Sequence, residues 1–268
     1  CTLKVAAHRR GSKAGELLIN VAIREAIRNG LDETYLTHYI EPDDDLVELI
    51  ARYGFTYSAD KANGESIFIK RLTPGPEDEP DPFETCVRFY PSFYDGDRVN
   101  KYLVPIRPKW HDRLFTAYED RQSQISEFAG FGSSEGNSIK KAYLCYANIR
   151  SIDQGDLLLF YRSHDHQEIT SLGVCERIEY ELEEAKAIQE FVGRVSVFTD
   201  DEIEEMAERP TTAIRFTWHF DLTDPVHYKV LLDEGVLKAG PQSIQELDEP
   251  HYKYIRDTGG IDERFTVN

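Results

Sequence analysis

Apolar residues recur at helical spacing between about residues 14 and 28, and short apolar runs on either side have the character of strands. Asn29-Gly30 supplies the end of the helix, and Asn63-Gly64 is a turn signal between two strands. The expected order over residues 1–71 is a strand at 2–6, a helix at 14–28, a strand at 34–40, a helix at 45–53, and hairpin strands at 55–58 and 66–71.

The segment that follows has a different composition. Residues 73–82 contain four prolines and four acidic residues, which suit neither a helix nor a central strand. This segment predicts a domain boundary. The expected division is a first domain at 1–72, an acidic, proline-rich linker and connecting segment at 73–97, and a second domain at 98–268.

The remainder of the chain has many short apolar runs separated by turn signals. Strands are expected at 101–106, 141–149, 156–163, 169–178, 194–198 and 212–220. Helices are expected at 110–115, 182–191, 200–209, 228–234 and 249–255. Strands interleaved with peripheral helices indicate a small α+β domain built on a mixed β-barrel.

Composition narrows the functional classes. The 268 residues carry a formal net charge of −18, which repels phosphate backbones at long range, so any nucleic-acid binding must be local and pocket-like. No apolar run is long enough to span a bilayer and no signal peptide opens the chain, so we expect a cytoplasmic protein without a membrane partner. The four cysteines form no metal-ligand spacing, and His164-Asp165-His166 is a poor metal site, so no metal is expected.

A basic, glycine-containing turn separates the first expected strand from the helix. Such a turn presents unpaired backbone N–H groups and the positive end of the helix dipole to an anion, typically a pyrophosphate. The alternative is a basic turn that only caps a helix. The candidate cofactor-binding residues are Arg9, Arg10, Gly11, Ser12, Lys13, Ala14 and Gly15.

The order of elements around this turn resembles the acetyl-CoA-dependent N-acetyltransferases of the GNAT superfamily from their fourth strand onward. Arg10, Gly11 and Gly15 fit the family's Gln/Arg-x-x-Gly-x-Gly/Ala turn, and Tyr53-Gly54-Phe55 matches the Gly-Phe that closes its last helix. Two positions depart from the pattern, since Lys13 replaces the middle glycine and Ile50 stands where the family often has a tyrosine acid.

That resemblance implies a partial GNAT fold of α/β class that binds acetyl-CoA and transfers the acetyl group to an amine of a small molecule or a protein. The sequence identifies no general acid or base.

A second motif lies in the C-terminal half, where Gly155-Asp156 leads into an apolar strand that ends in Tyr161-Arg162-Ser163. This resembles the PUA-like superfamily, in particular its EVE and ASCH branches, over residues 98–256. Residues 239–244 are similar to the closing loop of such a barrel. The resemblance implies recognition of RNA or of a modified nucleobase held in a pocket.

Such a pocket needs aromatic faces for stacking and polar groups for the edges of the base. Trp218 and Phe160 are further candidate faces, with core packing as the alternative, and Asn137 is a further candidate edge. The candidate base-binding residues are Trp110, Lys140, Tyr161, Arg162, Ser163 and Gln242.

Basic residues outnumber acidic ones by ten to seven between residues 98 and 163, although the whole chain is acidic. This surplus favours a local phosphate-binding track, with a solvated face of mixed charge as the alternative. The residues of the track would be Lys101, Arg107, Lys109, Lys140 and Lys141.

Two functions follow from these patterns. The first is an N-acetyltransferase whose substrate is recognised by the PUA-like domain. The alternative is a non-enzymatic protein that binds RNA or a modified base and carries a degenerate GNAT portion, and Lys13 and Ile50 favour it. A protein-interaction or toxin-type regulator built on the same folds is a third possibility.

Overall fold

The structure is a computed structural model that describes residues 14–42, 44–75, 78, 81–116 and 138–268. Its N-terminal part contains helices α1 (Ala14–Arg28) and α2 (Asp45–Arg52) and strands β1 (Glu33–His38), β2 (Thr56–Asp60) and β3 (Ser66–Arg71). The strands form an antiparallel sheet in the order β1-β3-β2. The elements expected between residues 14 and 71 are therefore present, while the expected strand at 2–6 lies outside the described residues.

The segment expected to be only a linker contains regular structure. Helix α3 (Pro82–Arg88) starts at the Asp81 cap, whose carboxylate accepts hydrogen bonds from Phe83 N and Glu84 N, and Pro82 occupies the first turn. Strand β4 (Phe93–Tyr94) follows, and the apolar side chains between them are buried. A proline at the first position of a helix costs no hydrogen bond, because the N–H of that position has no partner within the helix. The prolines of this segment are therefore compatible with a helix that begins at Pro82.

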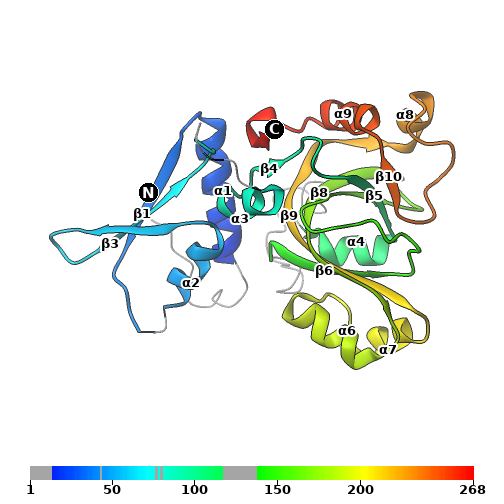
Figure 1. Cartoon of the computed structure of the whole chain (residues 1–268), viewed down its shortest axis with the longest axis horizontal. Coiled ribbons are helices and arrows are strands. Elements are labelled where there is room, and N and C mark those ends of the chain that lie inside the picture. Colours follow the sequence, from blue (N-terminus) through cyan, green and yellow to red (C-terminus); the bar gives the residue numbers. More distant parts are fainter. Residues whose placement is uncertain (1–13, 43, 76–77, 79–80, 117–137) are drawn as a thin grey trace, which may run out of the picture.

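The C-terminal part is built on one sheet of six strands, seen on the right of Figure 1. The strand order is β10-β5-β7-β8-β9-β6; β5 and β7 are parallel and all the other pairs are antiparallel. The strands are β5 (Lys101–Ile106), β6 (Lys140–Cys145), β7 (Leu157–Arg162), β8 (Glu168–Leu182), β9 (Thr211–His227) and β10 (Gln245–Leu247).

The expected mixed β-barrel is not closed in the described parts of the chain, because the two end strands, β10 and β6, do not pair. The expected strand at 194–198 is also absent: the 3₁₀-helix η3 (Gly193–Val195) lies there, and only Ser196 bridges to Ala142 of β6. The fold is an open, mixed sheet with helices around it.

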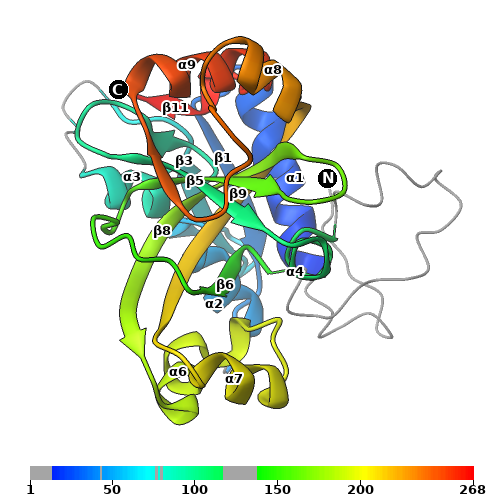
Figure 2. The ribbon, with the colours of Figure 1, turned by 90° about the vertical axis from the view of Figure 1, so that its right-hand side faces the viewer.

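Helices lie at both ends of the long strands β8 and β9, as Figure 2 shows. At one end are α6 (Ala185–Val192) and α7 (Asp200–Ala207), and at the other are α8 (Tyr228–Asp233) and α9 (Glu249–Thr258). Helix α4 (Pro108–Leu114) follows β5 directly. The chain ends with the 3₁₀-helix η4 (Glu263–Phe265) and β11 (Thr266–Val267), which pairs in parallel with β4.

An aromatic cluster fills the core of the six-stranded sheet. The ring centroids of Phe160 and Phe216 are 4.6 Å apart, and those of Phe115 and Phe160 are 5.0 Å apart. Gly173 faces this cluster, where an added Cβ would lie 2.8 Å from a Phe216 ring carbon. Phe160 is 1 % exposed, so of the two interpretations given for this residue the structure favours core packing.

Helix α1 lies between the two sheets in Figure 1 and makes polar contacts with the C-terminal part. Asn20 Nδ2 donates to the Tyr90 hydroxyl at 2.6 Å, and that hydroxyl donates to the Trp218 carbonyl oxygen at 3.0 Å. Near the other end of α1, Arg264 donates to the Arg28 carbonyl oxygen. The N-terminal sheet is therefore joined to the rest of the protein through buried hydrogen bonds.

Candidate functional site

A cavity of about 380 Å³ lies where the parallel strands β5 and β7 end. Parallel strands that lie side by side end at the same edge of a sheet, and here the backbone N–H and the hydroxyl of Ser163 both donate to the Ile106 carbonyl oxygen, at 2.8 and 2.9 Å. Residues 143–147, at the end of β6, and the loop at 240–244 complete the wall. The cavity thus lies beside the two end strands, β6 and β10, which would pair with each other in a closed barrel.

Four of the six residues proposed from the sequence as base-binding line this cavity. They come from α4, from the end of β7, from the residue after it, and from the loop before β10: Trp110, Tyr161, Ser163 and Gln242. Lys140 and Arg162 are not among the lining residues. Asn137, the further candidate edge, lies outside the described residues.

Two of the aromatic side chains that line the cavity, Trp110 and Tyr146, are at least partly exposed. Lys109 Nζ and Arg113 Cζ lie 4.4 and 5.1 Å from the Trp110 ring centroid. Trp110 is half-buried and packs against Phe198, with ring centroids 4.3 Å apart. Tyr146 is 45 % exposed, and the Arg209 guanidinium lies 5.5 Å from its ring centroid. Tyr146 was not among the residues selected from the sequence. It carries no local motif, and the loop at 240–244 that shares the cavity with it is remote in the chain.

Polar groups with free hydrogen-bonding capacity line the same space. The Tyr161 side chain is buried, which raises the pKa of its hydroxyl to about 12, and this hydroxyl has no hydrogen-bond partner among the described residues. Gln242 donates from Nε2 to the Gly240 carbonyl oxygen at 3.3 Å, which leaves its amide oxygen as an acceptor. The Ser163 hydroxyl donates to the protein and keeps its acceptor lone pairs.

The turn between β7 and β8 contributes His164 and Gln167 to the cavity, and both have left-handed backbones, with φ of 69° and 53°. For residues other than glycine this conformation costs roughly 1–3 kcal/mol each and persists only where surrounding contacts impose it. Contacts of the turn come from Arg162, whose Nε and Nη2 donate to the two carboxylate oxygens of Asp165 at 2.9 and 2.7 Å, and from Tyr228 N, which donates to the Gln167 carbonyl oxygen at 2.7 Å.

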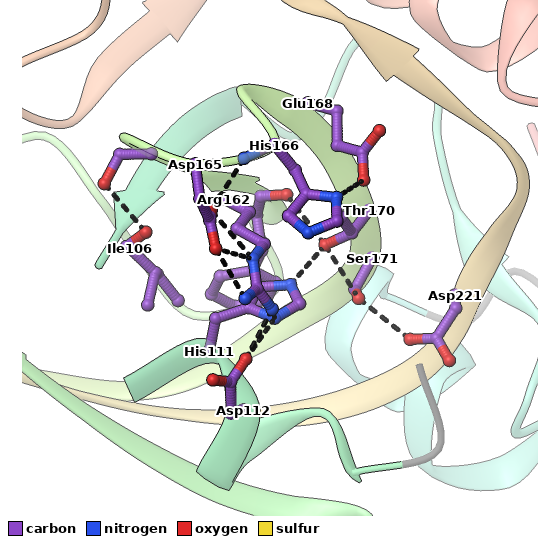
Figure 3. Close-up of polar contacts among 12 residues, drawn as sticks. Ile106, His111, Asp112, Arg162, Asp165, His166, Glu168, Thr170, Ser171 and Asp221 are labelled. Atoms are coloured by element: carbon purple, nitrogen blue, oxygen red, sulfur yellow. Dashed lines mark hydrogen bonds and ion pairs between the residues drawn. The ribbon is translucent and has the colours of Figure 1, made fainter. Parts of the chain in front are cut away.

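Arg162 also anchors the turn to helix α4 (Figure 3). It makes an ion pair with Asp112, and its Nη1 donates to His111 Nδ1 at 3.2 Å. His111 is fully buried, which lowers its pKa, so the imidazole is neutral and its Nε2–H donates to the Thr170 hydroxyl at 2.7 Å. Arg162 therefore organises the turn from behind instead of facing the cavity.

The chain of hydrogen bonds continues into the core beyond Thr170, as Figure 3 shows. The Ser171 hydroxyl donates to Asp221 Oδ1 at 2.8 Å and lies 3.2 Å from the Thr170 hydroxyl. The same carboxylate oxygen of Asp221 accepts from Trp218 Nε1 at 3.3 Å. Trp218 is 7 % exposed, so it also belongs to the core and not to a stacking surface.

The basic track expected from the sequence is largely neutralised. Carboxylates pair with three of its lysines: Lys140 with Glu176, Lys101 with Glu249 at 2.8 Å, and Lys109 with Glu202 at 2.6 Å. Lys141 is 2 % exposed. Arg107 is the remaining member; it is exposed, lines the cavity, and makes no ion pair with a described carboxylate.

The proposed acetyl-CoA turn is only partly described, since residues 9–13 lie outside the described parts, and Ala14 and Gly15 begin α1. Glu16, in the first turn of α1, is 7 % exposed, and its carboxylate accepts from the Ser138 hydroxyl and from Ile139 N, both at 3.3 Å. A carboxylate there weakens the attraction of the helix end for another anion. Acetyl-CoA binding by residues 9–15 stays a prediction.

Helix α2 and its end provide no accessible tyrosine that could act as the general acid of an acetyltransferase. Ile50 is fully buried, and the Tyr53 hydroxyl donates to the Glu16 carbonyl oxygen at 2.9 Å inside the core. Burial raises the pKa of Tyr53 well above its usual range.

Other chemistry at the site is limited. Among the described residues, no group of three or more His, Cys, Asp or Glu side chains could hold a metal ion. Cys145 lines the cavity as a free thiol, and burial raises its pKa to about 11, so the thiol stays protonated at neutral pH. No helix in the described parts of the chain combines the length and the apolar character needed to cross a membrane.

No family model and no curated protein matches the sequence. Several solved structures are similar in fold. An ASCH protein from Zymomonas mobilis is 12 % identical, with a TM-score of 0.44, over 60 % of this chain and 96 % of that chain. A protein from Rhodopseudomonas palustris is 14 % identical, with a TM-score of 0.35, over 61 % of this chain and 94 % of the other.

A third similar structure, from Agrobacterium tumefaciens, is 13 % identical, with a TM-score of 0.33, over 60 % of this chain and 94 % of the other. At TM-scores below 0.5 these likenesses are too distant to transfer a site or an activity. One of the three is an ASCH protein, and at this distance the comparison decides neither of the two resemblances drawn from the sequence.

Proposed function

We propose that this protein binds nucleic acid, in particular RNA, by taking one nucleobase into the cavity at the open side of its six-stranded sheet. One observation carries the proposal. Trp110, Tyr161 and Ser163, together with Gln242, were selected from the sequence as base-binding residues, and they line a single cavity although they come from distant segments. Their convergence supports a PUA-like recognition site.

The chemistry of the cavity suits a base. Its volume of about 380 Å³ lies within the roughly 300–1,000 Å³ usual for small-molecule pockets. Trp110 and Tyr146 supply aromatic faces, on which unpaired bases stack. The Tyr161 hydroxyl and the Gln242 amide supply a donor and an acceptor for the base edge.

Charge argues for recognition through the pocket and not along a strand. The net charge is −18, and three of the four lysines of the expected track are paired with Glu176, Glu249 and Glu202. A protein of this kind forms few phosphate contacts, and its affinity then depends only weakly on salt. Recognition of a base in this cavity needs no catalytic group, so it fits the alternative drawn from the sequence, a non-enzymatic protein that binds RNA or a modified base.

The test is a fluorescence titration with short single-stranded RNA. The protein has two tryptophans, of which Trp218 is buried, so a stacked base changes mainly the emission of Trp110. Gln242→Ala is expected to weaken binding about tenfold, because a base edge loses its partner. The matched control is Gln189→Ala on α6, which lies outside the cavity and should bind as the wild type does. Equal losses, or no loss, in the two variants would contradict the proposal.

We keep acetyl-CoA-dependent transfer as a second proposal, supported by the succession of α1, β1, α2, β2 and β3 with its antiparallel hairpin. Titration calorimetry with acetyl-CoA tests it, with Arg10→Glu as the variant. Saturable binding that is lost in the variant would support the acetyl-CoA turn. No binding by folded wild-type protein would overturn it without affecting the base-binding proposal.

A further inference from the structure

The cavity has one basic side chain that is both exposed and without an ion pair to a described carboxylate, namely Arg107. It follows β5 directly and stands just before Pro108, at the start of α4. Trp110 lies three residues later and lines the same cavity, so the guanidinium and the indole border one opening. The charge of Arg107 also reaches the Tyr143 hydroxyl on the β6 wall, where it opposes the rise in pKa that burial causes.

The neighbouring cations are already engaged. Glu202 pairs with both Lys109 and Arg113, at 2.6 and 2.8 Å. Arg162 is held by Asp112 and Asp165 behind the turn. Among the described residues, Arg107 is therefore the cation beside Trp110 that is left for an anion.

The surroundings of Tyr146, another residue that lines the cavity, are less favourable to an anion. At Tyr146, one cation, Arg209, acts together with two carboxylates, Glu205 and Glu208. A phosphate beside Tyr146 would meet net negative charge, so the surroundings of Arg107 and of Tyr146 differ electrostatically. This asymmetry gives a bound nucleotide a direction.

We propose, on the basis of the base-binding function above, that the unit recognised is a nucleotide whose single phosphate is held by the Arg107 guanidinium while its base occupies the cavity. A planar guanidinium matches two phosphate oxygens with two parallel N–H donors, which a lysine ammonium cannot reproduce. The phosphate belongs either to a free mononucleotide or to one position of an RNA strand, and the recognition chemistry is the same in both.

The experiment compares nucleosides with their 5′-monophosphates for the four common bases, by titration at pH 8, where imidazoles are ordinarily uncharged. At least one monophosphate is expected to bind tenfold or more tightly than its nucleoside. Its affinity should fall as the salt concentration rises, because ions screen the pair that the phosphate makes with the guanidinium. Arg107→Gln should abolish this preference, so that nucleoside and monophosphate bind equally well to the variant, and Arg107→Lys should keep part of it. Arg52→Gln, at the end of the distant helix α2, is the control.

Outcomes separate the two proposals. If a nucleoside and its monophosphate bind equally well, or if Arg107→Gln keeps the preference, the phosphate site is wrong and the base site stands. If no nucleoside, nucleotide or RNA binds, the base site itself fails. A short RNA that binds much more tightly than the monophosphate identifies a strand as the source of the phosphate, and equal affinity identifies the free nucleotide; either supports the Arg107 contact.

Discussion

Arg162 and Asp165 form a two-pronged ion pair across the turn between β7 and β8, with N···O distances of 2.9 and 2.7 Å. Neither residue lines the cavity, yet the turn they hold presents Ser163, His164 and Gln167 to it. The left-handed backbones at His164 and Gln167 depend on this support.

Loosening the turn is therefore expected to weaken ligand binding from a distance. Asp165→Asn keeps the shape but loses the charge of the pair, and we expect affinity for the preferred nucleotide to fall about five- to tenfold. His166→Gln, in the same turn but outside the cavity and without a bond to Arg162, is the control. Unchanged affinity in Asp165→Asn, measured on protein whose melting temperature matches the wild type, would show that the Arg162–Asp165 ion pair does not position the cavity residues.

Cys145 gives a direct report on occupancy of the cavity. It is partly exposed, whereas Cys86 and Cys175, the other described thiols, are 2 % and 0 % exposed. Because burial raises the pKa of Cys145 to about 11, its alkylation by a maleimide should be slow at pH 7 and faster at pH 9. Bound nucleotide should slow the reaction, as read by peptide mass spectrometry. Alkylation of Cys145 at the same rate with saturating ligand would place the ligand elsewhere.

The buried His219 makes stability depend on pH. Its Nδ1–H donates to the Pro91 carbonyl oxygen at 2.7 Å, and burial lowers its pKa to about 4. Between the usual histidine pKa and this value only the unfolded state binds the proton. The free energy of unfolding is therefore unaffected by His219 above about pH 6.5 and falls as the pH drops towards 4. The full loss is on the order of 3 kcal/mol, from about 1.36 kcal/mol per unit of pKa shift.

Urea unfolding at pH 7.5 and pH 5 checks this dependence. The wild type should lose clearly more free energy of unfolding over this interval than His219→Phe, which has no imidazole to protonate. His251→Gln, at a partly exposed position on α9, serves as the control and should follow the wild type. If the wild type and His219→Phe lose the same free energy of unfolding between pH 7.5 and pH 5, other groups control the stability at low pH.

Gly173 allows β8 to approach the aromatic cluster closely. A Cβ at this position would lie 2.8 Å from Phe216 Cδ2 and 2.9 Å from the Thr217 carbonyl oxygen, distances that neither a packed ring nor a backbone can yield easily. Gly173→Ala should destabilise the protein by roughly 1–3 kcal/mol, the usual cost of overpacking. Gly240→Ala, whose nearest atom would be 3.9 Å away, should cost little in the same denaturation experiment.

Local signals predicted the elements well where neighbouring residues determine them. The Gly155-Asp156 turn and the apolar run after it correspond to β7, and Asn63-Gly64 lies between β2 and β3. The cap and proline of α3 were also local signals, but the run of prolines before them suggested a linker. The open barrel was not foreseeable, because sheet closure depends on whether strands far apart in the chain can pair.

Sequence reasoning selected four residues that the fold places around one cavity, namely Trp110, Tyr161, Ser163 and Gln242. Their role in binding a base stays a prediction. The lysines were misleading, because their partners are remote in the sequence: Glu176 lies 36 residues from Lys140, and Glu249 lies 148 residues from Lys101. Only the folded chain distinguishes Arg107, which is exposed and makes no ion pair with a described carboxylate, from the paired lysines.

The hydrogen bonds that run from Asn20 through Tyr90 to the Trp218 carbonyl oxygen have a consequence for the energetics of the whole chain. Separating the two sheets would leave buried polar groups without partners, which makes a half-unfolded state costly. The two sheets should then melt together, as one calorimetric peak. A ligand bound at the cavity would in that case protect the distant sheet of β1, β2 and β3 from hydrogen exchange by the same free energy by which it stabilises its own binding site.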